Sequence, residues 1–283
     1  MAAAWLAFPF PTERFDRAPS SPLVTDRIGR PMLELVSSDD QWRQPVPLDQ
    51  MSQWLTQAPI AVEDKRFTSH VGVDPIALAR AVWQDARAAR IVSGASTITM
   101  QVCRMIDKRP RTWYAKTIQA FRALQLERLR TKDQILESYL NAAPYGGNLC
   151  GVEAASQAYF GKRAVDLSLA EAALLAGLPQ SPRRHRPDRY PNAARSRRDT
   201  VLRRMLESGL ITAEQKLLAS SEPIPSVRER RSPVAPHAAW LAMRRRPYGG
   251  QTTIDSEIQF EVEHAVAERA KMLPDGVDVA AVV

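Results

Sequence analysis

The feature that most constrains this chain is a pair of polar clusters at two helix boundaries between residues 61 and 119. The first runs Glu63-Asp64-Lys65-Arg66-Phe67-Thr68-Ser69-His70-Val71-Gly72, directly after a helical pattern. The second, Gly94-Ala95-Ser96-Thr97-Ile98-Thr99-Met100-Gln101, places hydroxyl side chains where another amphipathic helix would begin. A helix start with free N–H groups and hydroxyls can hold anionic oxygens. The two clusters therefore predict a carboxylate that faces an anion-binding helix start.

Charge and cysteine content narrow the classes of function. The chain has 283 residues, 45% of them hydrophobic, and a net charge of +8. These values predict one large domain with appendages or two domains, and they favour an anionic partner. The arginines gather around residues 183–189, 195–204 and 228–246, where a solvated basic surface is an equal alternative. The two cysteines and four histidines have no metal-ligand spacing, so we expect no metal cluster of protein ligands.

The amino terminus is apolar but too short to cross a bilayer. Residues 1–11 fall below the roughly 20 residues that a spanning helix needs, and no basic segment marks a signal peptide. Taken alone the sequence describes a soluble chain, although this stretch could also be the tail of a membrane anchor.

Helix start and stop signals fill the centre of the chain. Asp74 and Pro75 begin one helix, Thr112 caps another, and three pairs have capping-box spacing: Thr131 with Gln134, Ser168 with Glu171, and Thr212 with Gln215. A helix is expected from about Asn192 to Ser208, a hairpin from Leu23 to Val36, and strands at 252–254 and 277–283. The fold class is therefore mainly α, with short β/α extensions at both ends. Segment 1–45 is predicted as an anchor stub and linker hairpin, 46–215 as the core domain, and 216–283 as a Pro/Arg-rich linker followed by the truncated start of another domain.

The order of the motifs resembles glycosyltransferase family 51, the peptidoglycan glycosyltransferase domain of class A penicillin-binding proteins. The first motif is complete as Glu63, Asp64, Phe67, His70 and Gly72, and the second as Gly94, Ser96, Thr97, Thr99 and Gln101, with basic Arg104 following. The third keeps Lys116 but has Ala115 and Gln119 in place of an arginine and a second acid. The fourth matches 132–141 and the fifth 198–205, and Leu140-Asn-Ala-Ala-Pro-Tyr-Gly-Gly147 brings the chain nearest the 1C type. The resemblance covers about residues 46–212.

This resemblance implies a fold, a substrate and a place in the cell. The fold would be a lysozyme-like domain with a small membrane-facing lobe around residues 75–95. The substrate would be lipid II, joined to a growing glycan strand, with a divalent metal, Mg or Mn, near its pyrophosphate. The place would be the periplasmic face of the bacterial inner membrane, with an anionic membrane surface and other cell-wall synthesis proteins as partners. No transpeptidase signature of the Ser-x-x-Lys type occurs in the chain, so residues 251–283 resemble only the opening of that domain.

The implied reaction assigns roles to individual residues. An alcohol is a poor nucleophile, so a carboxylate must accept its proton, and Glu63 is assigned as this general base. Substrate binding is assigned to Asp64, Phe67, His70, Ser96, Thr97, Gln101, Arg104, Lys116 and Gln119. Asp64 and His70 could equally orient the loop, and Phe67 could be a packing residue.

Three other functions compete with this assignment. A catalytically impaired remnant that only binds lipid II or acts as a scaffold at the membrane is favoured by Gln119, which cannot act as acid or base. A hydrolase needs two carboxylates that flank one bond, which the adjacent Glu63 and Asp64 cannot do. A nucleic-acid binder is disfavoured because no reader motif accompanies the arginines.

Overall fold

The capping residues singled out in the sequence begin the expected helices in the computed structural model. Thr112 caps α6 (Trp113–Leu129), and complete capping boxes start α7 (Lys132–Ala142), α9 (Leu169–Gly177) and α11 (Ala213–Ser221). The structure describes residues 8–16, 19–88, 96–107, 110, 112–228, 233–274, 277 and 281. These form two units: unit 1 takes residues 1–18 and 43–229, and unit 2 takes 19–42 and 230–283.

Unit 1 is helical and contains the two polar clusters. Its remaining elements are α2 (Thr12–Asp16), η1 (Leu48–Gln50), α3 (Gln53–Glu63), η2 (Phe67–Ser69), α4 (Pro75–Ala88), α5 (Ile98–Ile106), β3 (Pro144–Gly146), β4 (Leu149–Cys150), α8 (Val152–Phe160), η3 (Ala164–Asp166) and α10 (Pro191–Glu207). The mainly α prediction is thus confirmed, and the helix predicted at 192–208 is α10.

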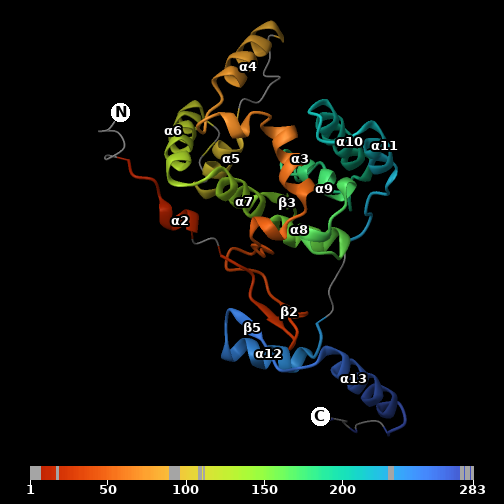
Figure 1. The fold of residues 1–283 in the computed structure, drawn as a ribbon. Coiled ribbons are helices and arrows are strands. Elements are labelled where there is room, and N and C mark those ends of the chain that lie inside the picture. The colour runs from red at the N-terminus through yellow and green to blue at the C-terminus, as the bar shows by residue number, and fades with distance from the viewer. Residues whose placement is uncertain are drawn as a thin grey trace. The chain divides into compact units, whose positions relative to one another are not determined.

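Two groups of helices meet at the end of α3. On one side α3, α9 and α10 pack around a buried cluster that contains Ala61 and Val62 of α3, Ala173 of α9 and Val201 and Leu202 of α10. Small side chains on α3 and α9 let these helices approach closely. On the other side α5 packs against α6 and α7 (Figure 1). The carboxyl end of α3 therefore lies beside both α10 and the start of α5.

Helix α4 projects from the other helices of unit 1 (Figure 1). Asp74 caps its first turn as predicted, accepting a hydrogen bond from the Ala77 N–H at 2.7 Å. Ile76 and Trp83 are each 62% exposed, and the Arg87 guanidinium lies over the Trp83 ring. Residues 89–95, the rest of the predicted lobe, lie outside the described residues.

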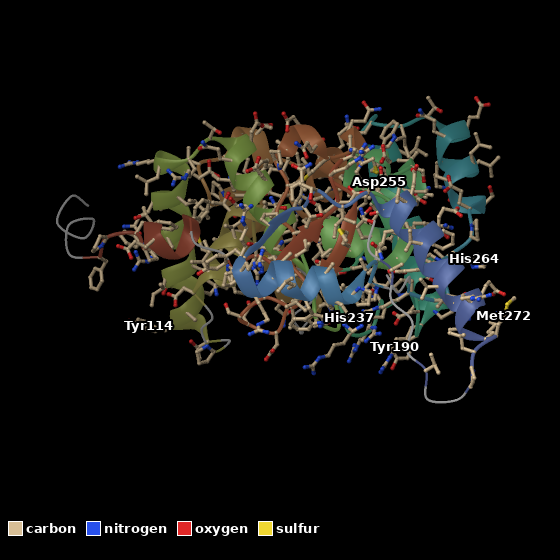
Figure 2. The ribbon with its side chains drawn as sticks, turned by 90° about the horizontal axis from the view of Figure 1, so that it is seen from below. Tyr114, Tyr190, His237, Asp255, His264 and Met272 are labelled. Atoms are coloured by element: carbon tan, nitrogen blue, oxygen red, sulfur yellow. The ribbon has the colours of Figure 1, made fainter. Side chains whose placement is uncertain are left out.

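Unit 2 joins the two ends of the chain in one small sheet. β1 (Leu23–Thr25) pairs antiparallel with β2 (Pro31–Glu34), as the hairpin prediction requires, and parallel with β5 (Gly249–Gln251). Helices α12 (Pro236–Arg245) and α13 (Ser256–Ala270) complete the unit, and Figure 2 shows His264 on α13.

This arrangement differs from the three expected segments. The hairpin that the sequence analysis grouped with an anchor stub belongs with residues 230–283. The strand expected at 252–254 lies three residues earlier, because Gly249 and Gly250 adopt positive φ angles that bring the chain against β1. Most of the strand expected at 277–283 lies outside the described residues.

Candidate active site

The Glu63 carboxylate is held between two helices. Glu63 is the last residue of α3, and its Oε1 accepts a hydrogen bond from the Arg197 guanidinium of α10 at 3.0 Å. Its Oε2 accepts one from the Gln101 amide of α5 at 3.2 Å. The Glu63 and Arg197 side chains are 15% and 11% exposed, so solvent screens this ion pair only weakly. These two hydrogen bonds fix the orientation of the carboxylate, and a small part of the Glu63 side chain remains exposed.

Two arginines of α10 lie at the end of α3. Arg197 also donates from Nε to the Gly177 carbonyl at 3.1 Å, and Arg204 donates to the Val62 carbonyl at 2.7 Å. The last carbonyls of a helix carry partial negative charge and have no partner within it. Burial lowers the pKa of Arg197, while the Glu63 charge acts in the opposite direction. The arginines thus compensate the negative end of α3 where Glu63 adds a further charge.

Asp64 links the two polar clusters. Its buried carboxylate accepts a hydrogen bond from the Ile98 N–H at 2.9 Å, at the first residue of α5. It also contacts Nε2 of His70 at 2.9 Å, and Nδ1 of His70 lies 3.1 Å from the Gly72 N–H, which can only donate. His70 therefore carries its proton on Nε2 and donates it to Asp64. This geometry gives Asp64 and His70 an orienting role, one of the two predicted alternatives.

Thr97 and Gly72 form a second link between the clusters. The Thr97 hydroxyl donates to the Gly72 carbonyl at 2.6 Å and accepts from the Met100 N–H, which caps α5. Gly72 has a φ of +100°, and a Cβ there would lie 2.6 Å from the Ala123 carbonyl oxygen of α6. Only glycine fits this position. The Thr97 hydroxyl, predicted to bind substrate, is already engaged by two backbone groups.

Phe67 is a buried side chain that lies under a cation. It is 2% exposed, and the Lys132 ammonium lies 4.6 Å from its ring centroid. Lys132 also donates to the His70 carbonyl at 2.6 Å and pairs with Glu127 of α6, which accepts from Thr99. This network joins both clusters to α6 and α7, and Phe67 packs within it.

The other predicted binding residues lie on α5 and α6 or, in the case of Ser96, just before α5. Ser96, Arg104, Lys116 and Gln119 are all half-buried. Lys116 and Gln119 lie one turn apart near the beginning of α6, which also carries the exposed Tyr114 (Figure 2). Gly94 lies outside the described residues. Substrate binding by these side chains stays a prediction.

Sequence reasoning missed two residues beside Glu63. Tyr139 of α7 is 1% exposed, and its hydroxyl has no hydrogen-bond partner within the described ranges. Burial raises the pKa of Tyr139 well above its usual value, the Glu63 charge raises it further, and Arg104 and Arg197 oppose both. Tyr139 matched the apolar spacing of its helix, and Arg197 stood in a run of arginines, so neither gave a separate signal.

The fifth motif begins at Arg198, the residue that follows Arg197. Arg198, which matched that motif, is 1% exposed and donates to the carbonyls of Ser220 and Glu222 at 2.6 Å. It therefore fixes the end of α11 rather than the candidate site.

The carboxylates around the site do not form a metal centre. Among the described residues no group of three histidine, cysteine or acidic side chains could hold an ion. Glu63, Asp64 and Glu127 each accept hydrogen bonds from protein donors instead. The donor set therefore does not fit a divalent cation bound by protein ligands alone.

Within the described residues, every helix falls short of the length and apolar character that a bilayer-spanning segment needs.

Comparisons with known proteins agree with the motif order. A family model described as transglycosylase matches residues 29–206. Penicillin-binding protein 1C of Escherichia coli K12 is 42% identical over 248 residues, which cover 87% of this chain and 30% of that protein. Penicillin-binding protein 1A of Aquifex aeolicus is 43% identical over 187 residues, 66% of this chain and 26% of that protein.

The chain is also similar to a protein of known structure. The crystal structure of penicillin-binding protein 1A from Haemophilus influenzae aligns with a TM-score of 0.45 and 24% identity, over 89% of this chain and 29% of that one. The chain thus spans less than a third of these relatives. Because the family model matches more than half of the chain, and does so over the residues that build the site around Glu63, the chain belongs to the transglycosylase family of class A penicillin-binding proteins.

Proposed function

We propose that unit 1 is a peptidoglycan glycosyltransferase that polymerises lipid II into glycan strands. The observation that carries this proposal is the fixed carboxylate of Glu63, at the end of α3 and beside the start of α5. Family membership supports the reaction class, and the geometry supports the choice of base.

Glu63 would accept the proton of the attacking sugar hydroxyl. The 4-hydroxyl of one sugar attacks the anomeric carbon of the other, that carbon inverts, and undecaprenyl pyrophosphate leaves. Each carboxylate oxygen of Glu63 receives one hydrogen bond from the protein and can accept another. A sugar hydroxyl can therefore bind to the base without displacing Arg197 or Gln101.

Cations would stabilise the departing pyrophosphate. Pyrophosphate is weakly basic, so it needs positive charge more than it needs a proton. Arg104 on α5 and Lys116 on α6 are the cationic side chains assigned to it, with Ser96 as a hydroxyl donor. Thr97 would act by fixing the start of α5, since its hydroxyl is engaged. No step is assigned to a divalent metal.

The lobe that begins with α4 would place this site at a membrane. Exposed Ile76, Leu78 and Trp83 beside Arg87 have the composition of a helix that enters an anionic membrane surface. The proposed function would have the protein act at the periplasmic face of the bacterial inner membrane, where other cell-wall synthesis proteins would be its partners.

A second candidate function is favoured by one substitution. Gln119 stands where the family has an acid, and an amide can bind oxygens without transferring protons. A catalytically impaired remnant would bind lipid II through the same residues and act as a scaffold.

The decisive experiment replaces the base by its amide. Glu63→Gln should abolish polymerisation of labelled lipid II while lipid II binding survives, because the glutamine oxygen can still accept from Arg197. Glu207→Gln is the matched control, since its carboxylate is 46% exposed in surface ion pairs on α10, and it should leave the rate unchanged. Polymerisation near the wild-type rate in Glu63→Gln would overturn the assignment. No polymerisation by the wild-type chain, with binding retained, would favour the remnant.

A further inference from the structure

We infer that Arg197 is the positioning residue of the catalytic base: it sets the orientation of the Glu63 carboxylate and keeps it competent to accept a proton. The inference rests on the proposed function and deepens it, because it assigns the base a dedicated cation from a helix distant in the sequence. Three features of the structure support it.

The first feature is the double anchoring of Arg197. Its Nε donates to the Gly177 carbonyl at 3.1 Å, and its Nη2 donates to Glu63 at 3.0 Å. A planar guanidinium bound at two separate points has little rotational freedom, which a lysine ammonium could not reproduce. The end of α9 thereby fixes Arg197, and Arg197 fixes Glu63.

The second feature is the space left for the arginine stem. Gly177 is the last residue of α9, and a Cβ there would lie 2.8 Å from Cγ of Arg197. The absence of a side chain at Gly177 therefore lets Arg197 pass between α9 and the end of α3.

The third feature is the charge at the end of α3. A carboxylate on the last residue of a helix lies at the negative end of the helix dipole, where neighbouring cations compensate both negative charges. Arg197 supplies a positive charge to Glu63 itself, and Arg204 supplies one to the Val62 carbonyl. The side chains of the Arg197–Glu63 pair are largely buried, so solvent screens it only weakly.

Other titratable groups face this pair from each neighbouring element. They are Arg204 of α10, Arg104 of α5, Tyr139 of α7 and His185 of the segment after α9. Burial keeps Tyr139 protonated, because it raises the pKa of that residue. Burial and the Arg197 charge lower the pKa of His185. Both are therefore neutral near pH 7, and Arg197 is the guanidinium hydrogen-bonded to Glu63.

The test measures kcat and KM of lipid II polymerisation. Arg197→Gln should lower kcat about a hundredfold with little change in KM, the scale of a misplaced catalytic group. Arg197→Lys should restore only part of kcat, because it keeps the charge and loses the double anchor.

Three further variants separate positioning from folding. Gly177→Ala keeps every charge but pushes against Arg197, so kcat should fall about tenfold while KM changes little. Arg203→Gln removes one charge from the exposed face of α10 and should leave kcat and KM unchanged. Arg198→Gln should lower thermal stability without lowering kcat of the folded protein, because Arg198 holds only backbone carbonyls and Asp199.

The outcomes distinguish this inference from the proposed function. Wild-type kcat and KM in Arg197→Gln, together with an inactive Glu63→Gln, would overturn the inference and leave the proposed function intact. An active Glu63→Gln would overturn the assignment of the base instead. A loss of folding in Arg197→Gln moves the decision to Arg197→Lys and Gly177→Ala, where wild-type behaviour of both would overturn the inference.

Discussion

Replacement of Asp64 by asparagine tests the link between the two polar clusters. The carboxylate accepts from the Ile98 N–H and from Nε2 of His70, and His70 accepts from the Gly72 N–H. An asparagine offers one oxygen to Ile98 and turns its NH2 group toward His70. If His70 keeps its proton on Nε2, two donors face each other. If the proton moves to Nδ1, the Gly72 N–H loses its acceptor. Either way one buried donor is left without an acceptor.

The expected loss of stability follows from this count of unpaired hydrogen-bond donors. A buried donor without an acceptor costs about 1–3 kcal/mol, and exchanging a charged acceptor for a neutral one costs about 1 kcal/mol more. Asp64→Asn should therefore lower the free energy of unfolding by about 2–4 kcal/mol. For a domain of this size that corresponds to a fall in Tm of roughly 4–16 °C.

The assay is urea and thermal unfolding followed by circular dichroism, with Asp166→Asn as control. Asp166 pairs with Arg163 at the surface, where both side chains are more than half exposed, so its loss should cost about 0.5 kcal/mol or less. Nitrogen NMR of the wild type should find the His70 proton on Nε2. A change of less than about 0.5 kcal/mol in Asp64→Asn, or a proton on Nδ1, would refute the donor count.

Three further predictions concern residues around Glu63. Tyr139→Phe should raise the free energy of unfolding by about 1 kcal/mol, because the buried hydroxyl has no hydrogen-bond partner within the described ranges; a loss in urea unfolding would contradict this. Gln119→Glu should modestly lower lipid II turnover, because the new carboxylate would lie one turn from Lys116 and repel the pyrophosphate, whereas a clear rise would favour the impaired remnant. Burial and then Arg197 lower the pKa of His185, so its stabilising contribution is full above pH 6.5 and declines as the pH falls below that value; His185→Gln should flatten the stability–pH curve there, and an unchanged slope would count against the shift.

Local signals in the sequence predicted most of unit 1. Capping boxes at Thr131, Ser168 and Thr212 depend on residues three apart, so they can be recognised without knowing the fold. The same holds for Thr97, which caps α5 through the Met100 N–H. The position of Glu63 at a helix end followed from the pattern of α3 alone.

The partners of Glu63 could not be predicted in this way. Arg197 and Arg198 are neighbours, and their roles differ because successive residues point to different faces of a helix. Arg198 lies on the buried stripe with Val201, Leu202 and Met205, a signal that the sequence already contained. The pairing of Arg197 with Glu63 depends on how α3, α9 and α10 pack, which no local pattern encodes.

The sheet of unit 2 could not be predicted either, because it also depends on contacts between distant segments of the chain. Its central strand pairs with residues Gly249 to Gln251, and two glycines are typical of a turn rather than a strand. A side chain at Gly249 would collide with the backbone of Leu23, so close approach explains the glycine. Pairing between segments so far apart produces no periodic pattern in the sequence, so it could not be predicted from the sequence.

That pairing also sets an order of events during synthesis. Thr25 and Thr252, which share a hydrogen bond, are 227 residues apart, so the hairpin leaves the ribosome long before its third strand exists. Closing so long a flexible loop costs about 5 kcal/mol of chain entropy. The contacts of α5 with α6 and α7 are much more local, and they can form first. Once unit 1 has folded, residues 43–229 are no longer a flexible loop, and both segments of unit 2 are attached to the same folded unit. Completion of the small sheet is thereby coupled to the folding of unit 1, and a nascent chain that fails to fold unit 1 would leave the edge of β1 open to other strands.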